Sequence, residues 1–142
     1  MSASKTKSWQ EKFDVAFGPK IEKAGKSFAG INSGQMMLIP TPALVDAYIR
    51  QIPKGKLVDT KVLRKDLAAE YHAEVTCPLT TGIFLRIVAE VAFEKIKKGT
   101  APENVTPFWR VISPDSPAAK KLSCGPGFIH KQRKKELREG IN

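Results

Sequence analysis

The strongest constraint on the fold is an apolar segment near the middle of the chain. Ten of the fourteen residues from Ile83 to Ile96 are apolar, so a helix over this segment must be buried around most of its circumference. Pro78 predicts where this helix starts, and two lysines followed by Gly99 predict where it ends. Three charged residues four apart are expected to form its polar stripe: Arg86, Glu90 and Glu94.

Two shorter helices are predicted before this segment. Thr41 is a suitable N-cap ahead of Pro42, and Pro53 ends the helix that they begin. Asp59 or Thr60 then caps a second helix, which has apolar residues on one side and cations on the other. The apolar run 36–39 predicts a short strand ahead of both helices.

Three elements are expected after the central helix. Phe108 to Ile112 reads as a strand, Ser113 to Pro126 as a polar loop, and Phe128 to Glu139 as a basic terminal helix. The fold class is therefore mainly α with short strands, and 142 residues suffice for one domain with a single core.

The first 35 residues differ in composition from the rest. We expect residues 1–35 to form a basic, loosely packed N-terminal extension and residues 36–142 to form the main domain. Trp9, Phe13 and Phe17 recur every four residues, which predicts a short amphipathic helix between Ser8 and Phe17.

The net charge of +10 and a pI near 9.8 favour a polyanionic partner, and nucleic acid is the first expectation. No apolar run reaches the roughly 20 residues of a membrane span, so no membrane partner is expected. No apolar signal core follows the first lysines, which favours a cytoplasmic location.

The two cysteines do not suggest a metal site or a cofactor. Cys77 and Cys124 are far apart, and His72 and His130 are the only histidines available as further soft ligands. We expect no metal and no cofactor, and interpret both cysteines as free thiols. A nucleophilic Cys124, activated by the neighbouring lysines 120 and 121, is the alternative.

Three segments, in this order, resemble the C-terminal domain of the alkylguanine-DNA alkyltransferases. They are Ile52 to Val58, which enters the first DNA-binding helix; Pro107 to Ile112, which matches the active-site strand; and Gly125 to Ile141, the closing turn and terminal helix. The resemblance covers about residues 39–140 and implies a winged helix-turn-helix domain. It is strongest to an alkyltransferase-like branch in which the strand reads Thr-Pro-aromatic-Trp-Arg.

In this resemblance Phe108 replaces the reactive cysteine and Trp109 replaces the neighbouring histidine. A phenyl ring has no lone pair with which to accept an alkyl group. The family relationship therefore implies recognition of alkylated guanine in double-stranded DNA without transfer, and delivery of the lesion to other repair proteins. Thr60 aligns with the family's base-swinging tyrosine. Gly82 aligns with its arginine finger, with Arg86 one turn later as a substitute.

The residues expected at the site fall into two groups, and no catalytic residue is expected. The DNA-binding group is Lys54, Lys56, Thr60, Lys61, Thr80, Thr81, Gly82 and Arg86. The base-pocket group is Phe108, Trp109 and Arg110, in which Phe108 also suits a core position and Arg110 has a mainly structural role in the family.

Two other functions stay open at this stage. The chain is either an active methylated-DNA-protein cysteine methyltransferase that uses another cysteine, or a protein-interaction module that kept the scaffold and lost DNA binding. Transfer of an alkyl group from DNA to the protein would indicate the methyltransferase. An absence of DNA binding would indicate the protein-interaction module.

Overall fold

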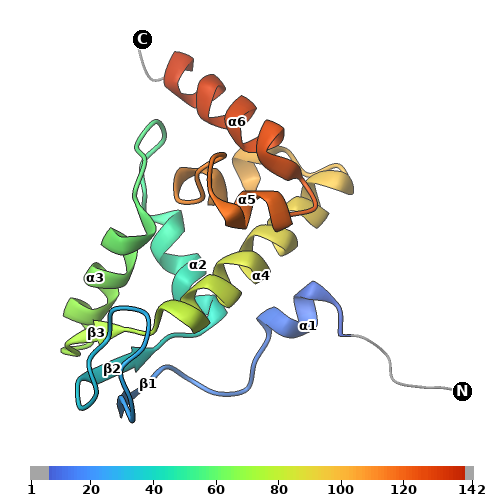
Figure 1. Ribbon diagram of the computed structural model, residues 1–142. Coiled ribbons are helices and arrows are strands. Elements are labelled where there is room, and N and C mark those ends of the chain that lie inside the picture. The colour runs from blue at the N-terminus through green and yellow to red at the C-terminus, as the bar shows by residue number, and fades with distance from the viewer. Residues whose placement is uncertain (1–6, 140–142) are drawn as a thin grey trace, which may run out of the picture.

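A computed structural model describes residues 7–139, which form a mainly helical domain with one small sheet (Figure 1). The helices are α1 (Trp9–Phe13), α2 (Pro42–Arg50), α3 (Thr60–Glu70), α4 (Pro78–Lys97), α5 (Pro117–Lys121) and α6 (Gly125–Glu139). Two 3-10 turns, η1 (Pro102–Asn104) and η2 (Phe108–Arg110), follow α4. The strands are β1 (Lys20–Lys23), β2 (Met36–Ile39) and β3 (Val75–Thr76).

The sheet joins the N-terminal segment to the rest of the fold. β2 pairs antiparallel with β1 and parallel with β3, so that Leu38 lies opposite Ile21 on one side and Thr76 on the other. The strand expected at residues 36–39 is confirmed. The boundary expected between residues 35 and 36 falls inside the β1–β2 hairpin, and Ala24 and Ile31 are buried beside the sheet.

α4 lies at the centre of the molecule (Figure 1), and its predicted boundaries are confirmed. Its core residues pack against α2, α1 and η2. The predicted polar stripe is wrong at Glu90, whose side chain is buried and accepts a hydrogen bond from Ser123 N at 3.1 Å. Ile83, in contrast, is 58% exposed. The front of α4 is therefore open to solvent, whereas its middle is enclosed.

N-caps explain where the first helices begin, and the caps of α2 and α3 are the predicted ones. Ser8 forms a capping box with Glu11 at α1, and Thr41 Oγ1 accepts from Leu44 N at 3.2 Å at α2. At α3 the cap is Asp59, and Thr60 is the first helical residue. Sequence signals of this kind act over three or four residues and need no tertiary structure.

The region after α4 differs from expectation in two places. The strand predicted for Phe108–Ile112 is wrong, because residues 108–110 form η2. Arg110 N donates to the Pro107 carbonyl and Val111 N to the Phe108 carbonyl, so these backbone groups are satisfied locally rather than by a neighbouring strand. The predicted polar loop contains α5, which Ser116 caps. α6 begins at Gly125, a little before the predicted start.

Within residues 7–139, no helix combines the length and the apolar character needed to cross a membrane.

Candidate nucleic-acid interface

The N-terminal ends of α3 and α4 lie close together. α3 starts at Thr60, after Asp59, whose carboxylate accepts from Lys61 N at 2.7 Å. β3 leads directly into α4, and Thr76 Oγ1 donates to the Arg64 carbonyl of α3 at 2.7 Å. This bond fixes the start of α4 relative to α3.

A cavity of about 320 Å³ lies between these two helices and the segment that follows η2. Three residues of the expected DNA-binding group line it: Thr60, Thr81 and Gly82. Val111 and Ile112 form the facing wall. The other lining residues are Asp59, Arg64, Pro78, Leu85, Ser113, Ser116, Pro117 and Ala118. Three residues that were predicted to share a site, one from α3 and two from α4, therefore line the same cavity.

The two threonine hydroxyls at the front of α4 have different environments. Thr81 is buried and donates to the Cys77 carbonyl at 2.6 Å, so its hydroxyl completes the first turn of the helix. Thr80 Oγ1 is buried and has no hydrogen-bond partner among the described residues. At Gly82 the surface is open, because a Cβ there would meet no atom within 4 Å.

Two exposed apolar residues on α4 were not expected at the site. Leu79 and Ile83 are 61% and 58% exposed, and they share a face of α4 with Gly82 and Arg86. The sequence did contain a signal for them: Leu79 and Ile83 precede Arg86 by seven and three residues, which places all three on one face of a helix. Arg86 itself lies over the Trp9 ring of α1, 5.3 Å from the ring centre.

Three cations of α3 lie beside this face. Lys61 and Lys65 are exposed and Arg64 is half-buried, and none of the three has an ion-pair partner among the described residues. Lys56, in the turn before α3, is also exposed and without such a partner in that part of the chain. These four cations are therefore not compensated by a neighbouring acid in the described chain.

The residues expected to form a base pocket lie elsewhere. Phe108 is completely buried and Trp109 is 2% exposed. The rings pack edge-to-face with centres 5.2 Å apart, and Phe128 of α6 contacts both. Phe108 therefore fills the core, as one of the two interpretations of this position expected. Neither ring lines the 320 Å³ cavity.

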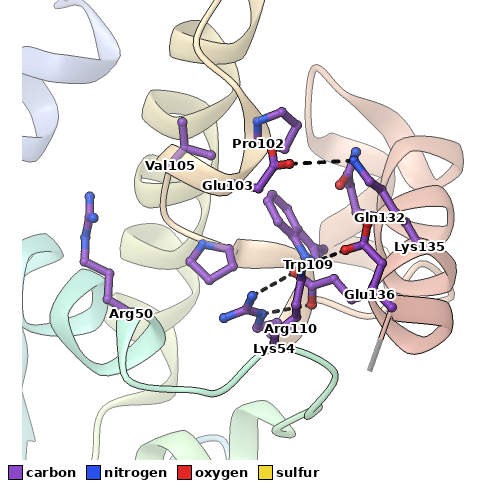
Figure 2. A pocket seen from close by; sticks show the side chains of 12 residues that line it. Arg50, Lys54, Pro102, Glu103, Val105, Trp109, Arg110, Gln132, Lys135 and Glu136 are labelled. Atoms are coloured by element: carbon purple, nitrogen blue, oxygen red, sulfur yellow. Dashed lines mark hydrogen bonds and ion pairs between the residues drawn. The ribbon is translucent and has the colours of Figure 1, made fainter. Parts of the chain in front are cut away.

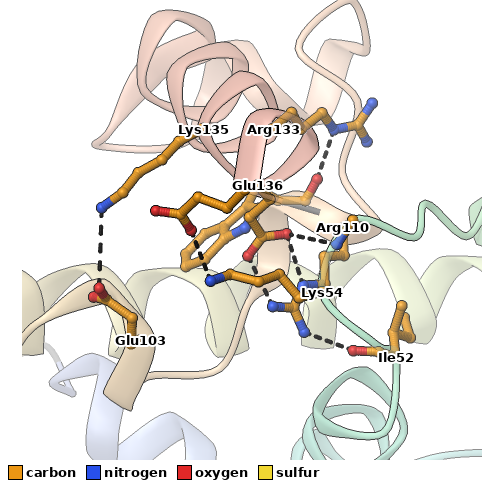
Figure 3. Close-up of polar contacts among 10 residues, drawn as sticks. Ile52, Lys54, Glu103, Arg110, Arg133, Lys135 and Glu136 are labelled. Atoms are coloured by element: carbon orange, nitrogen blue, oxygen red, sulfur yellow. Dashed lines mark hydrogen bonds and ion pairs between the residues drawn. The ribbon is translucent and has the colours of Figure 1, made fainter. Parts of the chain in front are cut away.

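Arg110 holds together three segments that are distant in the sequence, as Figure 3 shows, and Figure 2 shows its contact with Glu136. Its Nε and Nη2 donate to the two carboxylate oxygens of Glu136 at 2.9 and 2.8 Å, and its Nη1 donates to the Ile52 carbonyl at 2.6 Å. Arg133 Nε donates to the Trp109 carbonyl at 2.6 Å. These bonds connect η2, the turn before α3 and α6, so the structural role expected for Arg110 is confirmed.

Burial raises the pKa of Glu136, but hydrogen bonds from Arg110 and proximity to Trp109 outweigh it and leave the pKa below its ordinary value. The Trp109 indole N–H faces this carboxylate without a hydrogen bond of ordinary geometry, and it has no other partner in the described chain. Glu136 is thus a carboxylate held ionised by the groups around it.

Four cations in and around this cluster are each paired with a carboxylate. They line a second cavity of about 380 Å³ together with Trp109 (Figure 2). The pairs are Lys54–Glu139 at 2.7 Å, Arg50–Asp46 at 2.8 Å, Arg110–Glu136 at 2.8 Å and Lys135–Glu103 at 4.0 Å. The hydrogen bond that Lys54 donates to Glu139 raises the pKa of Lys54. Lys54 therefore belongs with this paired cluster rather than with the cations of α3.

Cys124 lies at the start of α6, next to the buried Glu90. Burial raises the pKa of its thiol to about 11, and the carboxylate of Glu90 adds to the shift. Since the thiolate is the nucleophile, this environment disfavours reaction at neutral pH. Cys77 is buried ahead of α4. Among residues 7–139, no three His, Cys, Asp or Glu side chains lie close enough to hold a metal ion.

Comparison with known proteins identifies no relative: no family model, curated protein or solved structure matches the chain.

Proposed function

We propose that the protein binds double-stranded DNA without catalysing a reaction, in the manner of the alkyltransferase-like proteins, and that it recognises alkylated guanine. In this proposal α3 and α4 form the helix-turn-helix of a winged helix domain. The observation that carries it is the 320 Å³ cavity, where Thr60, Thr81 and Gly82 meet beside cations that have no acidic partners among the described residues. Other repair proteins are the expected partners once a lesion is bound.

Charge supports a nucleic-acid ligand. Lys56, Lys61, Arg64 and Lys65 are concentrated between the turn before α3 and the middle of α3, in a chain of net charge +10. Each such cation that reaches a phosphate releases condensed counterions, which is the main sequence-independent source of affinity for DNA. Arg86 adds a cation on the exposed face of α4.

The shape of the cavity supports recognition of a base. Its volume is at the lower end of the range for small-ligand sites, roughly 300–1,000 Å³. Leu85, Val111 and Ile112 offer apolar contacts to a flat ring, and Thr60 and Ser113 offer hydroxyls at its edges. A base that left the duplex would lose a few kcal/mol of stacking and pairing, which contacts of this kind offset.

The chemistry of the chain supports binding without alkyl transfer. The position that matches the family's cysteine is Phe108, which lies in the core and has no nucleophilic atom. Cys124 has a pKa of about 11, so well under 1% of it is thiolate at neutral pH. The lesion would therefore remain intact in the complex.

The test is a titration of the purified protein with two duplexes of the same sequence, one plain and one with a single O6-methylguanine. We expect tighter binding to the lesion, and an affinity for both duplexes that falls steeply with salt, by about 0.9 in log K per log salt for each phosphate contact. Binding that does not depend on salt would contradict DNA binding. Equal affinity for the two duplexes would contradict lesion recognition.

The intact mass of the protein after incubation with the lesion-bearing duplex tests the absence of transfer. We expect no added methyl group on either cysteine. A stoichiometric gain of one methyl group would contradict the proposal and identify the chain as an active methyltransferase.

A further inference from the structure

A second hollow lies next to the candidate interface. This groove of about 520 Å³ is lined by α3, β3 and the turn at residues 29–31. Arg64 lines both this groove and the 320 Å³ cavity, so the two hollows adjoin at that side chain. Figure 1 shows the strands and the hairpin near the C-terminal end of α3. The groove therefore extends the candidate interface along α3 toward the N-terminal segment.

The groove is basic and sterically open. Lys61, Arg64 and Lys65 line it, and Glu74 is the only acid among its lining residues. Glu74 is already engaged, since its Oε1 accepts from Met36 N at 2.8 Å. The remaining α3 positions in the groove are alanines, 68 and 69, which leave room for a chain to lie against the helix. Three cations against one engaged carboxylate give the groove a net positive potential.

The turn at the edge of the groove is held in place by the fold. Ala29 and Gly30 both have positive φ, +48° and +83°, and Phe28 and Ile31 exchange two backbone hydrogen bonds across them. This is the geometry of a type I′ hairpin turn. Ile31 is 4% exposed and fixes the turn to the small core beside the sheet. Neither the Ala29 N–H nor the Gly30 N–H has an acceptor within the described chain, so both are available to a ligand.

We infer that this groove binds the sugar–phosphate backbone of a DNA strand where it continues past the candidate interface. The inference rests on the proposed function and adds to it a contact made by the N-terminal segment, outside the alkyltransferase resemblance. Phosphate oxygens accept hydrogen bonds from lysine, arginine and backbone N–H groups, which are the donors gathered here. Such contacts position the protein on the duplex without reading its sequence.

Two substitutions test the groove in the full-length chain. Lys65→Ala removes a cation that lines only this groove, and Ala69→Glu adds a carboxylate at an exposed position of α3 within it. With a plain duplex, we expect Lys65→Ala to lower the slope of log K against log salt by about 1. We expect Ala69→Glu to weaken binding more strongly, and both variants to shorten the region protected from hydroxyl-radical cleavage.

The matched controls are Lys95→Ala, near the far end of α4, and Ala47→Glu, at an exposed position of α2. They make the same changes of charge away from the groove, and circular dichroism verifies that all four variants are folded. If each groove variant behaves like its control while the wild-type protein binds DNA, the inference fails and the proposed function stands. If the wild-type protein shows no salt-dependent binding of DNA, both fail.

An acidic peptide is the other polyanion that such a groove would attract. Polyglutamate serves as the probe for it. If Ala69→Glu weakens binding of polyglutamate and leaves the affinity for the duplex unchanged, the groove takes acidic peptides and the inference is overturned.

Discussion

The molecule has two basic regions that differ in how their cations are neutralised. In the paired cluster around Arg110, each cation lies within 4.0 Å of a carboxylate, and the Arg110–Glu136 pair is largely buried, with side chains 14% and 8% exposed. On the α3–α4 face, Lys61, Arg64 and Lys65 have no acidic partner in the described chain. Sequence alone placed cations of both regions in a single patch.

The difference separates cations that stabilise the fold from cations that are free to bind. A buried carboxylate loses hydration, and it stays ionised only if donors replace the lost water. Arg110 supplies those donors to Glu136 and is thereby committed to the fold. Lys61 and Lys65 of α3 are exposed and incur no such desolvation in the free protein, and they add positive potential to the surface. The functional surface is therefore expected where the charges are left uncompensated.

The largest expected effect is on stability, from the paired cluster. Arg110→Ala leaves Glu136 buried without its main donor and should lower the free energy of unfolding by about 3 kcal/mol. Urea denaturation followed by circular dichroism measures this change. The control is Lys54→Ala, which breaks an exposed ion pair of the same cluster and should leave the transition almost unchanged. If the two variants lost the same free energy of unfolding, the buried pair would contribute no more to stability than the exposed pair.

The next effect is on DNA binding, from the α3–α4 face. Replacing Lys61 and Arg86 together by alanine should lower the slope of log K against log salt by about 1.8, since two phosphate contacts are lost. Arg86 also lies 3.9 Å from the buried carboxylate of Glu90 and over the Trp9 ring, so circular dichroism must first verify that the double variant is folded. Lys95 and Lys98, exposed at the other end of α4, provide the matched double control. DNA binding unchanged by the first pair would favour a protein-interaction module.

The smallest expected effect comes from Gly82, where one substitution should increase stability and weaken binding. Gly82→Ala should raise the free energy of unfolding by roughly 0.5–1 kcal/mol, because alanine is favoured in a helix and its Cβ meets open space. The same methyl group should weaken binding of the lesion-bearing duplex, because it narrows the approach to the cavity. Thermal melting and the duplex titration measure the two changes. A more stable variant with full affinity would show that the glycine has no role in binding.

The sequence predicted the elements whose signals are local. α2, α3 and α4 follow from caps, prolines and apolar spacing. Thr60 and Gly82 were selected by the family resemblance, and they line the same cavity as Thr81. β1 and β3 were not predicted, because a charged four-residue strand and a two-residue strand exist only through their pairing with β2.

The failures within the site have tertiary causes. Phe108 and Trp109 have strand-forming side chains, yet burial against Phe128 holds their backbone in η2. Lys54 reads as part of a basic run, but its partner Glu139 comes from the far end of the chain. No local pattern indicates which cation will meet which acid, so sequence did not divide the basic residues into two regions.

The network around Arg110 also has a consequence for the order in which the chain folds. Gly55 and Glu136 meet through it although they are 81 residues apart, so the turn that leads into α3 waits for α6 before it is locked. During synthesis, α3 and α4 emerge from the ribosome before α6, so they can pack against each other through the Thr76–Arg64 bond while the turn at Gly55 is still unanchored. The segment that carries Lys56 into α3 would then become fixed only after α6 has folded onto it.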